Sequence, residues 1–377
     1  MFTKNNALLF HKKYKGKIGT EVLTPIHSKE DLSLAYTPGV AEVSKEIFEH
    51  PSSVYDYTAK GHTVAIVTDG SAVLGLGNIG PEAALPVMEG KAALFKTFAD
   101  VDAFPLCLNT QNPKEIVEIV KAISPAFGAI NLEDIAAPNC FVVEEELQQI
   151  GIPVMHDDQH ATVIVVLAGL INSAKVAGKK LESLNVVVLG AGAAGMAITK
   201  FLAPRVADII SVDSEGIIHK ERSGLDIYKK ALAAITNKRN VSGGLVTALE
   251  NADVFIGVSK AGLFLADYIG FMAKNPIIFA LANPTPEIMP DVAKKAGAFI
   301  IATGRSDFPN QINNCLAFPG VFKGLLMAKA TKVTEKMKEN AAVAIAGMVK
   351  NPTKEKIIPT PFEKHLADTV ARAVASS

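Results

Sequence analysis

A glycine-rich loop between a short apolar run and a helical pattern constrains the fold of this chain more than any other feature. The run Val186–Leu189 leads directly into Gly190-Ala191-Gly192-Ala193-Ala194-Gly195, and residues 196–202 continue as a helix. Such glycines permit a tight turn, a close approach of the backbone to a ligand, and close packing of helix on strand. The N–H groups at that helix N-terminus favour an anion such as a pyrophosphate. We therefore predict a Rossmann-type dinucleotide site at Gly190, Gly192, Ala193, Ala194 and Gly195.

An acidic residue ends the next predicted strand. Residues 208–212 lead into Asp213, about 20 residues beyond the glycines, where a carboxylate can accept hydrogen bonds from the adenosine ribose. Ser214 and Glu215 follow, so the local sequence offers no positive charge to the extra phosphate of NADP. The pattern favours NAD, with NADP as the open alternative. The competing interpretation is a strand-to-helix turn that binds no ligand.

A second match to the same glycine pattern spans residues 75–80, but its context differs. No clean apolar strand precedes it, and Pro81 follows it at once. Its nearest later acids, Asp100 and Asp102, precede a predicted strand instead of ending one. These differences argue against a second dinucleotide site. We interpret residues 75–80 as a loop that closely approaches the substrate or the nicotinamide.

Apolar runs and helical patterns alternate along the chain, which predicts an α/β fold with parallel sheets and helices on their faces. A length of 377 residues with 49% hydrophobic residues suits two domains, each with a core. We place an N-terminal α/β substrate and metal domain at 1–155. A Rossmann-type, doubly wound dinucleotide-binding domain with C-terminal helices follows at 156–377. The predicted strands are 64–67, 104–108, 129–132, 154–155, 186–189, 209–212, 254–258, 277–281 and 299–301.

The charge balance excludes some classes of partner. Lys plus Arg number 38 and Asp plus Glu number 38, so no surplus of positive charge exists to bind nucleic acid or an anionic membrane. The longest apolar run, 161–171, is shorter than the roughly 20 residues of a membrane-spanning helix and predicts a buried helix. No signal or transit peptide is readable, and the three cysteines suit free thiols in a reducing compartment. We expect a cytoplasmic protein.

Four carboxylates follow two neighbouring predicted strands. Glu133-Asp134 closes one strand, and Asp157-Asp158 closes the next. Ligands bind at this edge of parallel sheets, and clustered carboxylates repel one another unless a cation such as Mg²⁺ or Mn²⁺ is bound. From spacing alone, helix capping or pairing with surface lysines is an equal alternative. His156 and His160 flank the acids and could indicate zinc, although histidines beside a metal more often lie in its outer shell.

Ordered motifs cover nearly the whole chain. They are Tyr36-Thr37-Pro38-Gly39-Val40, residues 68–77 (TDGSAVLGLG), Glu89-Gly90-Lys91, Asn131-Leu132-Glu133-Asp134, residues 156–160 (HDDQH), Ala282-Asn283-Pro284-Thr285, and Asn313-Asn314 before Phe318-Pro319-Gly320. Together they closely resemble the malic enzymes, in the short bacterial type that lacks an appended transferase domain. The resemblance implies metal-dependent oxidative decarboxylation of (S)-malate to pyruvate and CO₂ with reduction of NAD or NADP. It also implies decarboxylation of oxaloacetate and a homodimer.

The same resemblance assigns roles to acids and proton carriers. It implies Glu133, Asp134 and Asp158 as metal ligands, Lys91 as general base and Tyr36 as general acid. The base would remove the hydroxyl proton of malate as hydride leaves C2, and the acid would protonate C3 after CO₂ departs. A lysine acts as a base only if its pKa falls toward neutrality. Burial and a neighbouring cation would both lower the pKa of Lys91.

The remaining assignments concern positioning and substrate contacts. The resemblance implies that Asp157 orients Lys91 or shares protons with it. Asn283 and Asn314 would donate to the substrate, and Asn283 is assigned to the cofactor as well. Larger family members carry an arginine just before the Gly-Leu-Gly stretch for a substrate carboxylate, but here residues 71–72 are Ser-Ala. Arg305 is a candidate replacement, with a structural salt bridge as the alternative.

Other functions remain to be separated from this one. A dehydrogenase of another 2-hydroxy acid, or a cofactor-independent oxaloacetate decarboxylase, would share the metal centre. A silent dinucleotide-sensing module would require missing catalytic groups, yet Tyr36, Lys91 and the four acids are present. The apolar, tyrosine-bearing segment Leu32–Val40 could complete the active site of a partner subunit.

Overall fold

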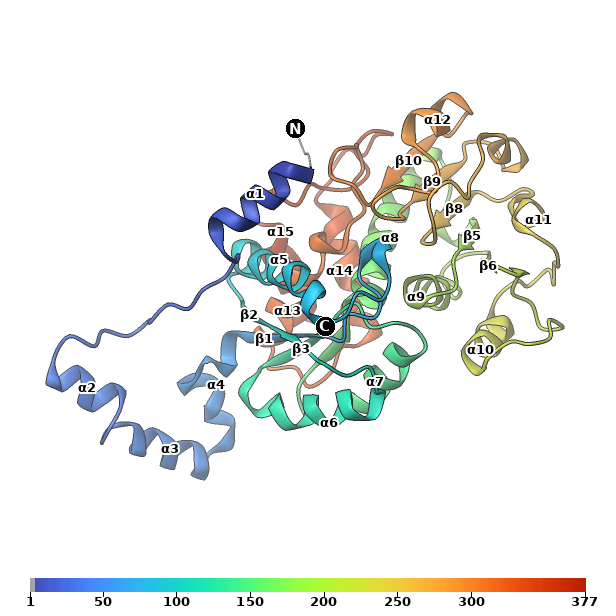
Figure 1. The fold of residues 1–377 in the computed structure, drawn as a ribbon. Coiled ribbons are helices and arrows are strands. Elements are labelled where there is room, and N and C mark those ends of the chain that lie inside the picture. The colour runs from blue at the N-terminus through green and yellow to red at the C-terminus, as the bar shows by residue number, and fades with distance from the viewer. Residues whose placement is uncertain (1–3) are drawn as a thin grey trace.

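Two β-sheets flanked by helices carry the functional groups in the computed structural model, which describes residues 4–377 (Figure 1). The first sheet is wholly parallel, in the order β2-β1-β3-β4. Its central strands are apolar and fully buried, as expected for a parallel sheet covered on both faces. Its strands are β1 (Thr63–Thr68), β2 (Asp102–Cys107), β3 (Ala129–Leu132) and β4 (Val154–His156).

Helices connect the strands of this sheet, as the alternation of patterns predicted. They are α5 (Pro81–Ala99), α6 (Pro113–Ile123) and α7 (Asn139–Leu147). Helix α6 is amphipathic: Ile116, Val117 and Val120 are buried, while its charged residues face outward. The side chain of Asn112 accepts a hydrogen bond from the N–H of Lys114 and so caps the start of α6.

The second sheet has the order β10-β9-β8-β5-β6-β7, in which only the two-residue β7 is antiparallel. This is the doubly wound Rossmann order, with β7 in the place of the third parallel strand. The strands are β5 (Asn185–Leu189), β6 (Asp208–Asp213), β7 (Gly216–Ile217), β8 (Val254–Gly257), β9 (Ile277–Ala280) and β10 (Ile300–Thr303). The helices of this unit are α9 (Ala193–Leu202), α10 (Ile227–Ile235), α11 (Leu245–Leu249) and α12 (Pro290–Lys295). The predicted fold class is confirmed.

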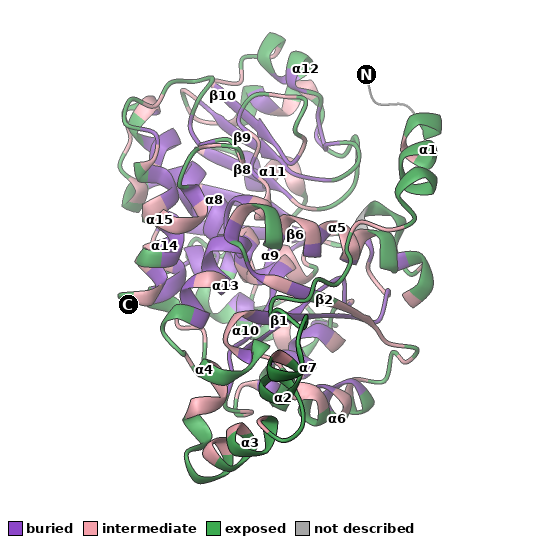
Figure 2. Cartoon of the chain, turned by 90° about the vertical axis from the view of Figure 1, so that its left-hand side faces the viewer, coloured by how far each residue is buried: buried purple, intermediate pink, exposed green. Residues whose placement is uncertain are grey.

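The long helix α8 (Asp157–Ala177) lies between the two sheets and is mostly buried (Figure 2). By length and composition it could cross a membrane, but 72% of its most apolar stretch is buried inside the protein. The prediction of a buried helix at 161–171 is therefore confirmed. Asn172 donates to the carbonyls of Ala346 and Ile357, each over 2.9 Å, so α8 is tied to the C-terminal part of the chain.

The C-terminal helices cover the first sheet as well as α8. They are α13 (Phe318–Met327), α14 (Glu335–Gly347) and α15 (Leu366–Ala375). The ring of Phe95 on α5 packs against Phe318 and Phe322 on α13, with centroid distances of 4.7 and 5.3 Å. One apolar core cluster accordingly includes residues from both sheets and from the C-terminal helices. The domain limits of 1–155 and 156–377 remain a prediction, and this core crosses them.

The N-terminal helices differ from the rest because none of their residues is buried. They are α1 (Lys4–Tyr14), α2 (Lys29–Ala35), α3 (Val40–Glu49) and α4 (Val54–Tyr57). Figure 1 shows α2 and α3 projecting away from the body of the molecule at the end of an extended segment. Lys17 anchors the start of this segment on α5, where its Nζ donates to the carbonyl of Pro86 over 2.7 Å. Residues 18–50 are called the N-terminal arm below.

Candidate active site

The carboxyl ends of β3 and β4 bring four acidic residues together. Leu132 pairs with His156 in the parallel register, so Glu133-Asp134 and Asp157-Asp158 emerge side by side at one sheet edge. Asp134 has a φ of 53°, the left-handed conformation that Asp tolerates better than most residues. The chain therefore turns between Glu133 and Asp134, which is the break needed for both carboxylates to face one centre.

Glu133, Asp134 and Asp158 form a candidate metal site. Each offers a carboxylate oxygen, and the three atoms lie within 4.8 Å of one another. The N–H of Asp134 also donates to Asp158 Oδ2 over 3.0 Å, which links the two strand ends. Burial raises the pKa of Glu133 well above its usual range despite the charge of Lys91, and the charges of the other acids add to this effect. A cation would relieve this repulsion, so the donor set fits a hard divalent metal.

Lys91 lies on α5 within reach of this cluster. Its Nζ forms an ion pair with Glu133 Oε2 at 2.7 Å, bonds to Asp157, and lies 4.2 Å from the ring centroid of Phe318. Burial alone would lower the pKa of Lys91, but the charges of Asp157 and Glu133 outweigh it and raise the pKa. In the chain without a cation this pKa therefore does not fall toward neutrality, because two carboxylates contact the ammonium, and the expected fall with a cation bound remains a prediction.

Asp157 joins the predicted base to a predicted substrate residue. It is fully buried at the N-terminus of α8, and its Oδ2 also accepts a hydrogen bond from Asn314 Nδ2 over 2.6 Å. The contact of Asp157 with Lys91 agrees with the predicted pairing, and Asn314, which was predicted only as a substrate donor, joins the same connected group. Lys96, further along α5, is exposed and pairs with Asp100 and Asp102, as an ordinary surface lysine does.

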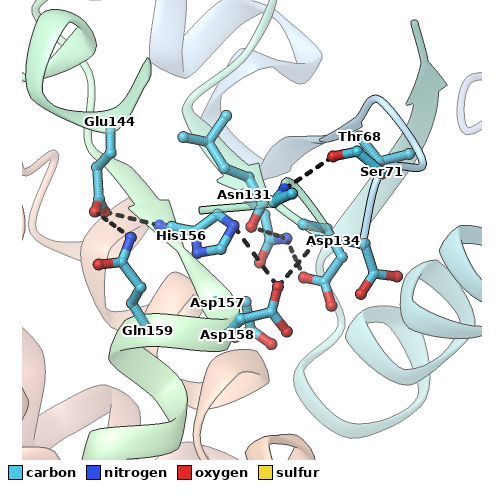
Figure 3. A network of polar contacts seen from close by, with 12 residues as sticks. Thr68, Ser71, Asn131, Asp134, Glu144, His156, Asp157, Asp158 and Gln159 are labelled. Atoms are coloured by element: carbon cyan, nitrogen blue, oxygen red, sulfur yellow. Dashed lines mark hydrogen bonds and ion pairs between the residues drawn. The ribbon is translucent and has the colours of Figure 1, made fainter. Parts of the chain in front are cut away.

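A residue that the sequence analysis missed supports the turn from β4 into α8. Glu144 on α7 accepts hydrogen bonds from the N–H of His156 over 2.8 Å and from the side chain of Gln159 over 3.0 Å (Figure 3). It also contacts the side chain of His160 over 3.0 Å. The imidazole of His156 is fully buried, with Nε2 3.6 Å from Asp158 Oδ2. His156 therefore lies beside the acid cluster, as a residue of an outer shell does, whereas His160 contacts Glu144 and Lys338. Glu144 lies in a run of three glutamates, which resembled a solvated helix face.

The glycine loop has the geometry of a dinucleotide site. Gly190 has a φ of 116°, and its N–H donates to the carbonyl of Val212 on β6 over 2.9 Å. A Cβ on Gly195 would collide with the carbonyl oxygen of Gly190, so α9 can approach β5 only with glycine there. A Cβ on Gly192 would meet nothing within 4 Å, which leaves the space in front of the helix N-terminus open. Ala193 and Ala194 begin α9 and present its first N–H groups toward that space.

Asp213 ends β6 beside this loop, as predicted. The expectation that no positive charge lies nearby is wrong, however, because Asp213 Oδ2 accepts hydrogen bonds from Arg222 and Lys229, each over 2.8 Å. Although burial acts in the opposite direction, these bonds lower the pKa of Asp213 to about 2. Both cations come from segments that the sequence analysis did not connect with the cofactor.

The second glycine loop approaches the Rossmann unit. Gly75 lies so close to the carbonyl oxygen of Asn283 that a Cβ would collide with it. Asn283 follows β9, and its Nδ2 donates to the carbonyl of Leu281 over 3.3 Å. Arg305 is held by Asp307 through two hydrogen bonds of 2.8 and 2.6 Å, and it donates to the carbonyl of Pro284 over 3.0 Å. The structure thus shows the salt bridge, and the role of Arg305 toward the substrate remains a prediction.

Tyr36 is separated from the other predicted catalytic residues. It directly follows α2 on the N-terminal arm, and it is 67% exposed. Figure 1 shows α2 well away from α5 and α8, which carry Lys91 and Asp157. The structure therefore brings together the predicted base and the predicted metal ligands, and it leaves the predicted acid outside the site of its own chain.

The fold and the site define a class of protein: a two-sheet α/β oxidoreductase with a Rossmann dinucleotide loop and a candidate carboxylate metal site beside a buried lysine. Family comparison matches residues 15–148 to the model for "Malic enzyme, N-terminal domain" and residues 160–377 to "Malic enzyme, NAD binding domain". The chain belongs to the malic enzyme family.

Individual relatives agree with this placement. The chain is 54% identical to the bifunctional malic/malolactic enzyme of Bacillus subtilis, over 100% of this chain and 93% of that one. It is 44% identical to the NADP-dependent malic enzyme of Halomonas elongata, over 98% of this chain and 92% of that one. The crystal structure of the NAD-dependent malic enzyme from Thermotoga maritima superimposes with a TM-score of 0.95 at 50% identity, covering 98% of this chain and 99% of that one.

Proposed function

We propose that this chain catalyses the oxidative decarboxylation of malate to pyruvate and CO₂ with reduction of NAD or NADP, in a reaction that requires a divalent cation. The observation that carries the proposal is the contact of Lys91 with both Glu133 and Asp157. This contact supports the proposal because Lys91 Nζ lies 2.7 Å from Glu133, one of the three residues whose carboxylate oxygens could hold a metal. Malate offers a carboxylate and a hydroxyl that such a site can hold and deprotonate.

The residues divide the work in a definite way. Glu133, Asp134 and Asp158 would hold Mg²⁺ or Mn²⁺, since the donors are oxygen atoms only. A bound cation would supply polarisation of the substrate oxygens, and a bound nicotinamide would supply the acceptor for the hydride at C2. Lys91 Nζ accepts the proton of the C2 hydroxyl, and Asp157 holds the lysine in place. Tyr36 donates a proton to C3, so the proton lost by the hydroxyl is balanced by the one gained at C3.

The arrangement also explains how Lys91 can start the reaction unprotonated. In the free chain its two carboxylate partners raise the pKa of the ammonium. Glu133 belongs to the candidate metal site, so a bound cation would compete with Lys91 for that carboxylate. The positive charge of the cation would then act together with burial to lower the pKa of the lysine. Metal loading and base activation would accordingly be coupled through Glu133.

The reaction is tested by initial rates with malate under NAD or NADP, with and without Mn²⁺ or Mg²⁺. Lactate, tartrate and sulfolactate serve as alternative substrates, and decay of oxaloacetate without a nucleotide measures decarboxylation alone. Pyruvate and lactate are both quantified, because one relative is named a malic/malolactic enzyme. Nucleotide reduction with another 2-hydroxy acid but not malate, or oxaloacetate decay as the only activity, would contradict the proposal. Nucleotide binding without any turnover would instead indicate a sensing module.

We further propose that the chain forms a homodimer in which the N-terminal arm of one subunit supplies Tyr36 to the partner. The arm carries large apolar side chains that are exposed in the single chain, and a protein surface normally avoids such an extended apolar patch. These exposed residues are Ile18, Val22, Leu23, Ile26, Leu32, Leu34, Tyr36, Val40 and Phe48. An arm that lies on a second copy would bury this surface and complete the site that lacks its acid.

Mixed dimers test this arrangement. Subunits that carry Lys91→Ala or Tyr36→Phe, each impaired alone, are co-expressed with different tags. Tyr14→Phe, a substitution at another exposed tyrosine, serves as the control. If the arms are exchanged, a mixed dimer contains one intact site, and random pairing restores about a quarter of wild-type activity. If each arm folds back onto its own chain, every site keeps one defect and no activity returns.

A cytoplasmic location is also proposed, supported by three free thiols at Cys107, Cys140 and Cys315.

A further inference from the structure

Asp213 shares its carboxylate with two cationic side chains. Arg222 Nη2 and Lys229 Nζ each donate to its Oδ2 over 2.8 Å, and Arg222 Nη2 also donates to Oε2 of the exposed Glu215 over 3.1 Å. The exposed fractions of the three side chains are only 7% for Asp213, 12% for Arg222 and 25% for Lys229. Salt in the solvent screens such partly buried charges weakly. These three residues are called the ribose-edge cluster below.

Both cations are held in place by contacts that do not involve Asp213. Arg222 Nη1 donates to the carbonyls of Gly216 and Ile217, over 3.1 and 3.4 Å, on the short strand β7. Lys229 lies in the first turn of α10, where its backbone N–H donates to the capping side chain of Asp226 over 2.8 Å. Because these anchors are independent of Asp213, both cations should stay at this edge when the charge of Asp213 is removed.

The ribose-edge cluster lies next to the glycine loop. The N–H of Gly190 donates to the carbonyl of Val212, the residue immediately before Asp213. In Rossmann folds a carboxylate at this strand end accepts hydrogen bonds from the ribose of NAD, whereas a cation nearby accommodates the 2′-phosphate of NADP. In this chain, groups suited to each of the two cofactors converge on one position.

We propose that Arg222 and Lys229 form a subsite for the 2′-phosphate of NADP that Asp213 masks, so that this one carboxylate sets the preference for NAD over NADP. The inference rests on the proposed function and names the residues that choose its cofactor. The ionised carboxylate occupies both cations, accepts hydrogen bonds from ribose hydroxyls, and repels a phosphate dianion. Once that charge is absent, Arg222 keeps only the exposed carboxylate of Glu215 as an acidic partner, and both cations can donate charge-assisted hydrogen bonds to the phosphate.

The test measures binding of NADH and NADPH, without malate, to the full-length chain and to Asp213→Asn. Nucleotide fluorescence is a clean signal here because the chain contains no tryptophan. Asp213→Asn should weaken NADH binding and tighten NADPH binding. The ratio of the two dissociation constants should shift by about 100-fold, since two charge-assisted hydrogen bonds contribute roughly tenfold or more each. NADPH binding that stays as weak as in the wild type would overturn the proposal.

Further variants connect the gain to the two cations. In the Asp213→Asn background, Arg222→Met and Lys229→Met should each remove much of the gained NADPH affinity. Lys230→Met, at the next and exposed position of α10, should not. A gain that survives the loss of both cations would contradict the assignment. If Asp213→Asn does not fold, Lys229→Met in the otherwise wild-type chain is decisive, because it should weaken NADPH more than NADH.

These measurements are independent of catalysis. A chain that binds NADH and NADPH as expected but does not oxidise malate would contradict the proposed function and leave the subsite assignment intact. If the chain oxidises malate but Asp213→Asn leaves the cofactor preference unchanged, the subsite assignment is contradicted and the proposed function stays intact. The two proposals therefore fail in different ways.

Discussion

Asp157 and Asp158 are neighbours at the start of α8, yet their carboxylates serve different groups. Asp157 contacts Lys91 and Asn314, whereas Asp158 lies with Glu133 and Asp134 in the candidate metal site. The division follows from the helix, where consecutive side chains point in directions about 100° apart. One turn of one helix thus carries a residue proposed to position the base and a residue of the candidate metal site.

Substituting these two residues should separate the two roles. Asp158→Asn keeps the size but removes a charged ligand, so we expect Mn²⁺ affinity to fall by about 100-fold or more, beyond the 10- to 100-fold typical of outer-shell changes. Asp157→Asn should lower turnover with a much smaller loss of Mn²⁺ affinity. Calorimetric titration with Mn²⁺ and with NADH checks both variants, and NADH binding should be retained. Full activity of the wild type in excess chelator would refute the metal assignment.

Lys91→Ala and Tyr36→Phe should have different phenotypes. The first removes the base needed for hydride loss, so malate oxidation should fall by roughly 100-fold or more. The second removes only the later acid, so oxaloacetate should still be decarboxylated while enolpyruvate tautomerises slowly. Lys96→Ala, on the same helix as Lys91, is the matched control and should behave like the wild type. Isotope labelling at C3 of the pyruvate product provides the readout. If the Tyr36→Phe variant keeps wild-type turnover and still protonates C3 on a single face, the tyrosine is not the acid.

Two glycines of one loop should respond to alanine in opposite ways. Gly195→Ala places a methyl group against the carbonyl oxygen of Gly190, so we expect destabilisation by about 1–3 kcal/mol from overpacking. Gly192→Ala meets nothing within 4 Å and should leave the melting temperature nearly unchanged. It should nevertheless weaken NADH binding, because its methyl group occupies the space that a pyrophosphate would enter. Thermal melts and NADH titrations of both variants distinguish these outcomes; a stable Gly195→Ala variant would contradict the packing argument.

The cysteines should react slowly with thiol reagents at neutral pH. Burial raises the pKa of the Cys140 thiol to about 12, and burial together with Asp157 raises that of Cys315 to about 12 despite the opposing charge of Lys91. At pH 8 only about one molecule in 10⁴ would then carry the thiolate, which is the reactive form. Reactivity should increase as the pH rises toward these values. Mass spectrometry after timed iodoacetamide treatment measures each site, and rapid labelling of Cys140 at pH 8 in the folded chain would contradict this expectation.

The sequence predicts those parts of the molecule that local patterns determine. Buried parallel strands such as 186–189 are short apolar runs, and their ends place acids such as Glu133 and Asp158 at one sheet edge. Contacts between distant segments were not predictable in this way. Arg222 and Lys229 reach Asp213 from 9 and 16 residues further along, through a hairpin and a helix cap that leave no cofactor motif.

Other differences between the sequence-based predictions and the structure also have physical causes. Glu144 resembles a surface residue in the sequence because two more glutamates follow it, and only the packing of α7 against β4 reveals its buried role. Tyr36 belongs to an apolar segment that raised the possibility of a shared site, but its position relative to the body of the chain is set by tertiary structure and not by the local pattern. The pKa of Lys91 depends on how many carboxylates contact its ammonium, which is set by tertiary structure.

The apolar core that crosses residues 155–156 has a consequence for how the chain unfolds. Helix α8 packs between the sheets, and Asn172 on it bonds to Ala346 and Ile357. Those bonds stay within the second half, but the apolar core that surrounds α8 includes residues of both halves, so separating the halves would expose this helix and leave neither half with a complete core. Heating should therefore give one cooperative calorimetric transition instead of two, with the glycine loop and the acid cluster lost at the same temperature.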